Sequence, residues 1–191
     1  MFSFMKIATI AALAFGTFAS AVPIVEERSV APVVEARQAQ TLSTVLTTLQ
    51  NSLTPAVAPL NSLTATTATP ESVTAIAANI NVALQVAIDS VKKLPKGAIG
   101  GLDIVVSLSV ILNLIFVPIG KVYGFPGVDQ VALKVIFVGI GTLVAELLTL
   151  VLGVLRGVLS LVVGLLVGLI GGIVPIILEL NITVLINVLL L

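Results

Sequence analysis

The stretch Gly157–Leu178, GVLSLVVGLLVGLIGGIVPIIL, holds 22 residues without a charge, and 15 of them are Val, Leu or Ile. Arg156 and Glu179 bracket it. As one helix it would be about 33 Å long, enough to cross the roughly 30 Å hydrocarbon core of a bilayer. Taken alone, the stretch therefore predicts a transmembrane helix. A second uncharged run, Ile104–Gly120, holds 17 residues.

The whole chain shares this apolar character. Of its 191 residues, 58% are hydrophobic and only 9% are charged, with nine basic and nine acidic side chains. Soluble domains usually carry about 25% charged residues, and disorder requires low hydrophobicity. The composition thus argues against a disordered chain, and the lack of a basic surplus argues against a nucleic-acid partner. Because Cys and His are absent, disulfides, zinc thiolates and Cys/His nucleophiles are excluded.

Residues 1–21 predict a secretory signal peptide. Lys6 supplies the positive start, and the uncharged run Ile7–Phe15 is too short to span a bilayer. Ala19 and Ala21 form an A-x-A cleavage site. An N-terminal membrane anchor is the alternative. Secretion would place the mature chain in an oxidising space without any cysteine, so its fold must depend on apolar packing or assembly.

Residues 22–40 form a short charged stretch. It contains Glu26, Glu27, Arg28, Glu35 and Arg37, interleaved with Pro and Val. Two interpretations stay open: a pro-segment cut after Arg28 or Arg37, or a flexible arm that is retained.

The mature chain then divides into a Ser/Thr-rich amphipathic half, 41–96, and a hydrophobic half, 97–191. Residues 41–74 alone hold fourteen Ser and Thr, and residues 38–96 contain no glycine. In the first half we expect a helix at 41–53, because its apolar residues form one stripe, and Pro55 should end the pattern. A second helix is expected at 70–94, with Thr69 as its cap and Pro70 at its first position.

Small residues recur every three or four positions in the hydrophobic half, which places them on one face of a helix. This small-residue seam consists of Gly139, Thr142, Thr149, Gly153, Gly157, Ser160, Gly164, Gly168 and Gly171, interrupted by Glu146. Small side chains let helix backbones approach closely, which is how helices associate where water supplies no hydrophobic driving force. The seam therefore predicts a helix-packing surface, although a low-complexity Val/Leu/Gly segment would also look periodic.

The predicted fold class is all-α: amphipathic N-terminal helices followed by a long, very apolar, glycine-seamed helical region. In the hydrophobic half we expect helices at 103–118, 128–173 and 176–190. The long middle helix has candidate breaks near Gly139–Gly141 or at Gly153. Residues 179–191 also show an alternation that suits a strand, but helix is favoured. Asn181 begins the only N-glycosylation sequon and should stay unmodified if this tail is buried or in lipid.

No catalytic constellation is present, so we expect neither an enzyme nor a cofactor or metal site. The sequence contains no P-loop, dinucleotide fingerprint or G-x-S-x-G elbow. Glu146 and Arg156 are expected to pair with each other, because an isolated buried charge is costly.

The complete layout resembles a family of small secreted proteins of mushroom-forming fungi. The features that carry the resemblance are the secretory signal, the short charged arm, the helix opened by Thr69-Pro70-Glu71, and the cysteine-free apolar half that ends in Leu-Leu-Leu. The resemblance covers the full chain but depends on layout and composition, with no ligand motif to carry over. It implies a structural role in the cell wall and extracellular matrix, in forming aerial hyphae and attaching them to hydrophobic surfaces. This role is similar to that of hydrophobins, whose cysteine framework the chain lacks.

Two functional hypotheses follow. In the first, the chain is a secreted surface-active protein whose apolar half adsorbs to air or a hydrophobic solid, while its Ser/Thr-rich half faces water and cell-wall polysaccharide. Self-association is expected, because large exposed apolar patches associate in water. In the second, it is an integral membrane protein with one to three spans that pack through the seam.

Overall fold

The computed structural model describes residues 41–95, 102–155 and 159–190, and in these ranges every regular element is a helix and no strand is present. The elements are α1 (Leu42–Ser62), α2 (Pro70–Lys92), α3 (Leu102–Tyr123), α4 (Gln130–Val154), α5 (Leu159–Leu169), α6 (Val174–Leu180) and α7 (Thr183–Leu189). The all-α prediction is confirmed. The predicted signal peptide (1–21) and charged arm (22–40) lie outside the described residues.

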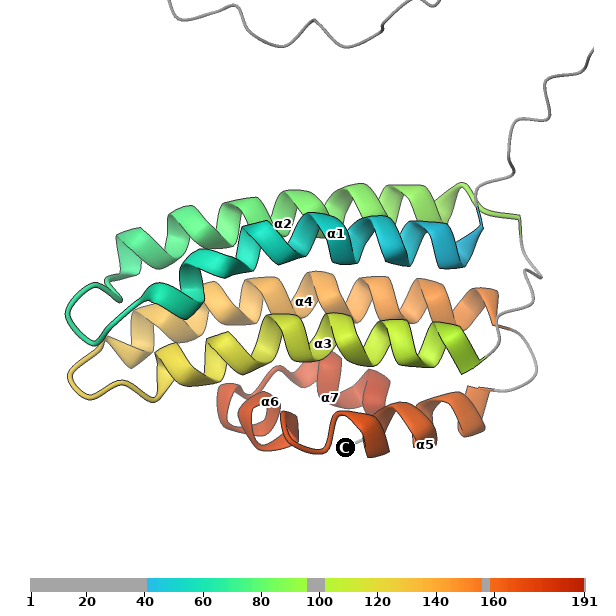
Figure 1. The fold of residues 1–191 in the computed structure, drawn as a ribbon. Coiled ribbons are helices and arrows are strands. Elements are labelled where there is room, and N and C mark those ends of the chain that lie inside the picture. The colour runs from blue at the N-terminus through green and yellow to red at the C-terminus, as the bar shows by residue number, and fades with distance from the viewer. Residues whose placement is uncertain (1–40, 96–101, 156–158, 191) are drawn as a thin grey trace, which may run out of the picture. The chain divides into compact units, whose positions relative to one another are not determined.

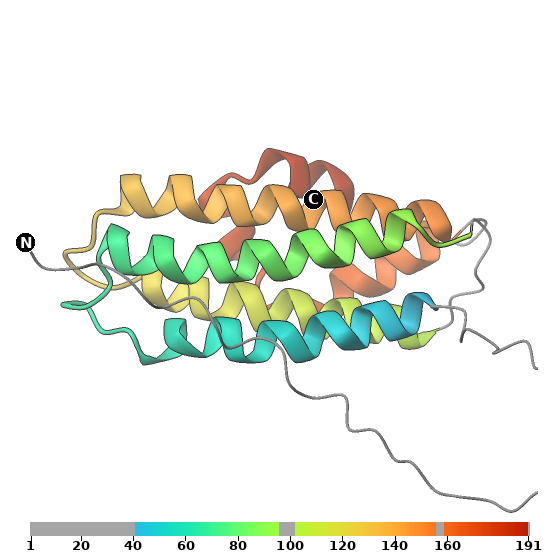
Figure 2. The ribbon, with the colours of Figure 1, turned by 90° about the horizontal axis from the view of Figure 1, so that it is seen from above.

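The helices form three layers. α1 packs along α3, α2 packs along α4, and α1 and α2 lie beside each other. On the other side of α3 and α4 lie the three short helices, with α5 against α3, α7 against α4, and α6 touching both (Figure 1). Seen from above, α1 and α2 lie over α3 and α4 (Figure 2). We call α5–α7 the C-terminal layer.

The middle layer has the apolar character that this arrangement requires. α3 and α4 contain few polar residues, and the largest of their fully buried side chains are Phe116 and Phe137. A helix that is apolar on most of its circumference must be covered on more than one side. The amphipathic helices α1 and α2 cover one side, and the C-terminal layer covers the other.

α1 is longer than the sequence predicted. It was expected to end near residue 53 but continues through Pro55 and Pro59 to Ser62. Both prolines are exposed, so water can reach the carbonyl groups that lose their helical partners. Beyond them Val57 and Leu60 are buried, and this packing keeps the last turns helical. α3 likewise passes Pro118 and ends at Tyr123 instead of residue 118.

The single helix expected over 128–173 is wrong. α4 ends at Val154, close to the candidate break at Gly153, and α5 begins at Leu159. The candidate break near Gly139–Gly141 is not used, since α4 runs through it.

The uncharged run Gly157–Leu178 does not form one straight helix either. Its described helical parts, Val162–Leu169 and Val174–Leu180, are bent by 93°. Gly171 and Gly172 lie in the turn, and Pro175 starts the next helix, where its missing N–H costs nothing. The transmembrane prediction made from this run alone therefore fails for a straight span.

The C-terminal tail is helical, as favoured over a strand, but it forms two helices instead of one at 176–190. Asn181 caps α6 in the left-handed conformation, with a φ of 53°. Asn tolerates this conformation better than most residues, and it lets the chain reverse into α7.

The buried stripe of α1 gives a test of the layered core. Leu53→Ala should lower the free energy of unfolding by about 2–5 kcal/mol, because Leu53 is fully buried and its truncation leaves a cavity. Thr54→Ala is the matched control: Thr54 is exposed and its hydroxyl bonds only to the carbonyl of Gln50. Urea unfolding followed by circular dichroism should show a large loss for the first variant and little change for the second. Equal losses would contradict the assignment of this face to the core.

Candidate functional site

Exposed large apolar side chains are distributed unevenly between the layers. Two of them, Val82 and Val86, lie on α2, and the other ten in the described part of the chain lie on α3 to α7. These ten are Val106, Val110, Val117, Val131, Val135, Leu165, Leu169, Leu178, Val184 and Leu190. Five of these ten lie on α3 and α4 and five in the C-terminal layer, against two on α2.

The surface of the C-terminal layer is the candidate site. Its exposed large side chains, which we call the C-terminal apolar face, are Leu165, Leu169, Leu178, Val184 and Leu190. Glu179 is the only charged residue between Gly157 and the end of the sequence. Gly164 and Gly168, also exposed, add no polar group. On α5 the described exposed residues are leucines and glycines, a surface that water solvates poorly, whereas α6, α7 and the turn between them also expose Glu179, Asn181, Thr183 and Asn187.

The α1–α2 layer presents the opposite chemistry. α1 contains no charged residue, and its exposed side chains are mainly Ser, Thr and Asn. Several hydroxyls donate to carbonyl groups of their own helix: Thr47 to Ser43, Thr48 to Thr44, Ser52 to Thr48 and Thr54 to Gln50. Their oxygens remain free to accept hydrogen bonds from water. α1 is therefore polar without being charged, whereas α2 exposes the charged residues Glu71, Asp89 and Lys92 and the apolar Val82 and Val86.

Two glycines of the middle layer leave space into which isoleucines of the C-terminal layer pack. A Cβ at Gly141 of α4 would lie 2.7 Å from Cγ2 of Ile182 and 3.2 Å from its Cγ1. A Cβ at Gly120 of α3 would lie 2.8 Å from Cγ1 of Ile176. Real Cβ atoms do not approach so closely, so each isoleucine occupies space that only glycine leaves free. We call these two contacts the glycine seats.

The sequence did not single out either glycine seat. Gly120 and Gly141 lie off the predicted seam, and only the tertiary packing distinguishes them from other glycines. The spacing of glycines within one helix shows which residues share a face, but it does not show which face meets a neighbour.

The small-residue seam lies elsewhere. On α4, Gly139, Thr142, Thr149 and Gly153 are exposed, and a Cβ added at either glycine would meet nothing within 4 Å. In the C-terminal layer Gly164 and Gly168 are equally open, and Gly171 follows α5 in a turn. Gly157 and the side chain of Ser160 lie outside the described residues. The seam is thus divided between two helices, and its described part does not pack helices of this chain together. Packing against a second molecule stays a prediction.

One ion pair joins α2 to α4. The Lys92 ammonium donates to the Glu146 carboxylate at 2.9 Å, and both side chains are about half exposed. Glu146 therefore pairs with a lysine from another helix, whereas the expected partner, Arg156, lies outside the described residues. The hydrogen bond that Lys92 donates to Glu146, and then the negative charge of Glu146, raise the pKa of Lys92 above its usual value. Its stabilising effect is present at neutral pH and is lost only when the pH rises through that raised pKa.

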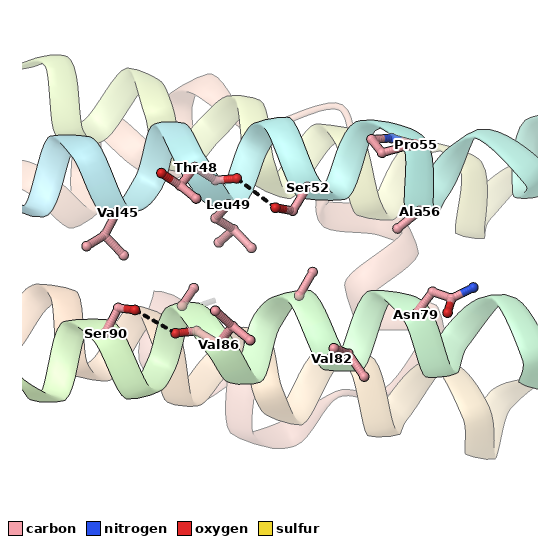
Figure 3. Close-up of a pocket in the computed structure, with 12 residues that line it drawn as sticks. Val45, Thr48, Leu49, Ser52, Pro55, Ala56, Asn79, Val82, Val86 and Ser90 are labelled. Carbon is pink, nitrogen blue, oxygen red and sulfur yellow. Dashed lines mark hydrogen bonds between the residues drawn. The ribbon is translucent and has the colours of Figure 1, made fainter. Parts of the chain in front are cut away.

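A groove of about 460 Å³ lies between α1 and α2 (Figure 3). It is lined by Val45, Thr48, Leu49, Ser52, Pro55, Ala56, Asn79, Val82, Ala83, Val86, Ala87 and Ser90. None of these is charged, and the hydroxyls of Ser52 and Ser90 donate to their own helices. The groove offers an apolar floor with few free donors and no acid–base group.

Within the described ranges, no three Asp or Glu side chains come together as a metal site would require. Asn181, the candidate glycosylation residue, is exposed in the turn between α6 and α7, and the hydroxyl of Thr183 bonds to its carbonyl at 3.4 Å. We expected Asn181 to stay unmodified only if it were buried or in lipid, and within this chain it is not buried.

Comparison with known proteins adds no relative: no family model, curated protein or solved structure matches this chain.

The two kinds of glycine in α4 give a matched test of the seats. Gly141→Ala should destabilise the protein by about 1–3 kcal/mol, because the new methyl group overlaps Ile182. Gly139→Ala, two residues away in open space, should stabilise it by about 0.5–1 kcal/mol through the better helix propensity of alanine. Thermal or urea unfolding measures both. Changes of the same sign would show that Ile182 does not fill the space at Gly141.

Proposed function

We propose that this chain is a secreted, surface-active structural protein that adsorbs through its C-terminal apolar face. One observation carries the proposal: the α1–α2 layer and the C-terminal layer lie on opposite sides of α3 and α4. In the first, the exposed residues of α1 are rich in hydroxyls; the second exposes five large apolar side chains beside one charged and three neutral polar side chains. A molecule with these two sides orients at a boundary between water and an apolar phase.

The energetics of adsorption favour a stable film. Removing apolar area from water contributes about 25 cal/mol per Å². Covering a few hundred Å² therefore stabilises the adsorbed state by several kcal/mol, about 7 kcal/mol for 300 Å². In water without an interface, the same surface favours self-association.

The biological setting comes from the family resemblance. We propose that the protein lies in the fungal cell wall and extracellular medium, where it promotes the formation of aerial hyphae and their attachment to hydrophobic surfaces. The predicted signal peptide supports secretion. The hydroxyl-rich exterior of α1 suits contact with water and cell-wall polysaccharide. No enzymatic step is required for this role.

An integral membrane protein is the second candidate, and it has its own supporting observation. Three helices are long and apolar enough to cross a membrane: Pro70–Lys92, Asp103–Tyr123 and Gln130–Val154. Taken as one span, the bent pair in the C-terminal layer would be a fourth. In this case the exposed seam residues of α4 would pack against another helix in the bilayer.

Fractionation of the producing cells separates the two functions. A secreted surface-active protein should be found in the culture medium and the cell wall, and alkaline carbonate should leave little of it in membranes. Retention of all the protein in carbonate-washed membranes would establish the membrane protein instead, because spanning helices resist extraction.

Charge substitutions test which face adsorbs. Leu165→Lys with Leu169→Lys should weaken adsorption to a hydrophobic solid by about tenfold or more, since two half-buried leucines contribute roughly 1.5–3 kcal/mol. The control pair is Val82→Lys with Val86→Lys on α2. Its valines are 64% and 60% exposed, against 41% and 53% for the two leucines. A quartz crystal microbalance measures the adsorbed amount.

The control pair should adsorb like the unmodified protein, and circular dichroism should show that both variants stay helical. If the α2 pair weakened adsorption as much as the α5 pair, the C-terminal face would not be the adsorbing surface.

A further inference from the structure

We infer that the C-terminal layer undocks from α3 and α4 at an apolar interface, so that its hidden inner side becomes a second adsorbing surface. This inference rests on the proposed function and adds a conformational step to it. Three features of the described residues support it: the nature of the contacts that hold the layer, the chemistry of its two sides, and its division into short helices.

The first feature is the scarcity of polar bonds between the C-terminal layer and the rest. Among the described residues a single hydrogen bond joins them, from the Lys134 ammonium to the carbonyl of Glu179, and it is long at 3.4 Å. The other layers are joined by shorter bonds: Lys92 to Glu146 at 2.9 Å, and the Lys121 ammonium to the carbonyl of Asn61 at 2.8 Å. Undocking the C-terminal layer therefore breaks almost no polar bond, whereas separating α1 and α2 from the middle layer breaks two charged ones.

The second feature is that the C-terminal layer carries large apolar side chains on both of its sides. Its inner side chains are buried, and the largest of them are Leu166, Ile170, Ile173, Ile177, Leu180, Ile182, Leu185 and Leu189. In water, undocking would expose these residues and is opposed by the hydrophobic effect. At an apolar interface the same residues are buried again against the second phase. The interface thus binds the undocked state better than the docked state, and this difference shifts the equilibrium.

The third feature is the construction of the layer from three short helices. α5 and α6 are separated by a 93° bend, and Asn181 reverses the chain between α6 and α7. Short helices joined by turns can spread side by side on a surface without breaking their internal hydrogen bonds. α1 to α4 would stay together beside them, held by their own packing, with the uncovered side of α3 and α4 against the apolar phase.

The glycine seats allow the movement to be blocked. The Cβ of Ile182 is one bond from atoms that lie 2.7 and 3.2 Å from the Cβ position of Gly141. The two Cβ positions are therefore about 3–4 Å apart, close to the separation that a disulfide needs. The same holds for Gly120 and Ile176. Because the chain has no cysteine of its own, an introduced pair has no competing thiol.

The experiment compares oxidised and reduced forms of two double variants, Gly141→Cys with Ile182→Cys and Gly120→Cys with Ile176→Cys. Each is spread from the purified full chain on a Langmuir trough, and the area per molecule is measured at constant surface pressure. Neutron reflectivity gives the thickness of the same film. The reduced form of each variant is the control for its oxidised form, so a change in stability caused by the substitutions affects both alike. The unmodified chain with and without reductant controls for the reductant itself.

The inference predicts a larger and thinner film for the reduced form. α5–α7 hold 25 helical residues against 47 in α3 and α4, so moving them into the film plane should enlarge the area per molecule by about 1.5-fold. The film should become thinner by about 10 Å, the spacing of one helix layer. Oxidised protein should still adsorb, because its outer face is unchanged.

Equal areas and thicknesses for oxidised and reduced forms, with both adsorbing, would overturn the undocking and leave the proposed function intact. Failure of the unmodified chain to adsorb would overturn the proposed function and the undocking together. A second variant with the same response as the first would show that the effect comes from the layer and not from one substituted position.

Discussion

Burial of α3 and α4 is the constraint on which the rest of the structure depends. Neither helix has a continuous polar face, so each needs an apolar cover on two sides. The chain supplies one cover from a helix pair with hydroxyls on its outer side, and the other from three short helices that carry large apolar side chains on both sides. The first cover buries one side of the middle layer and presents polar groups to water. The second cover buries the other side, but its own outer surface exposes apolar side chains that an apolar phase or another molecule would have to cover.

The order of the helices along the chain follows from this constraint. α1 and α2 come first and can cover α3 and α4 as these are made, because α1 packs on α3 and α2 on α4. The ion pair from Lys92 to Glu146 and the hydrogen bond from Lys121 to Asn61 then fix the two pairs with charged donors. The only charged donor that reaches the last layer, among the described residues, is Lys134 of α4. The attachment of this layer therefore depends on the close packing of isoleucines against glycines.

Much of the fold was predictable from sequence, because apolar periodicity is a local property. The helix at Pro70–Lys92 was expected with its Thr69 cap, and the break after Gly153 was one of two candidates. The predicted ends of α1 and α3 were wrong because both helices continue past prolines. In α1, the burial of Val57 and Leu60 outweighs the hydrogen bonds lost at Pro55 and Pro59. The prediction of one continuous helix over 128–173 was wrong. The same pattern of small and apolar residues continues on both sides of the break, so the periodicity of the sequence does not reveal it.

The candidate site was predictable only in outline. The composition already placed the apolar surface in the second half of the chain, but not on its outermost layer. The seam was expected on one face of a continuous helix, but it is divided between α4 and the C-terminal layer, and its α4 residues face outward. The contacts of Gly120 and Gly141 depend on isoleucines 41 to 56 residues away. Long-range packing of this kind leaves no signal in the spacing of glycines alone.

The hydroxyl groups of α1 have a consequence for the material that such molecules would form. Their protons are held by carbonyls of the same helix, and no ionisable side chain lies on that helix. Hydration of this surface depends on neutral acceptors, which neither titrate nor attract a counterion atmosphere. A coating that presents α1 to water would keep its wettability in acid rain-water and in salty or drying soil alike.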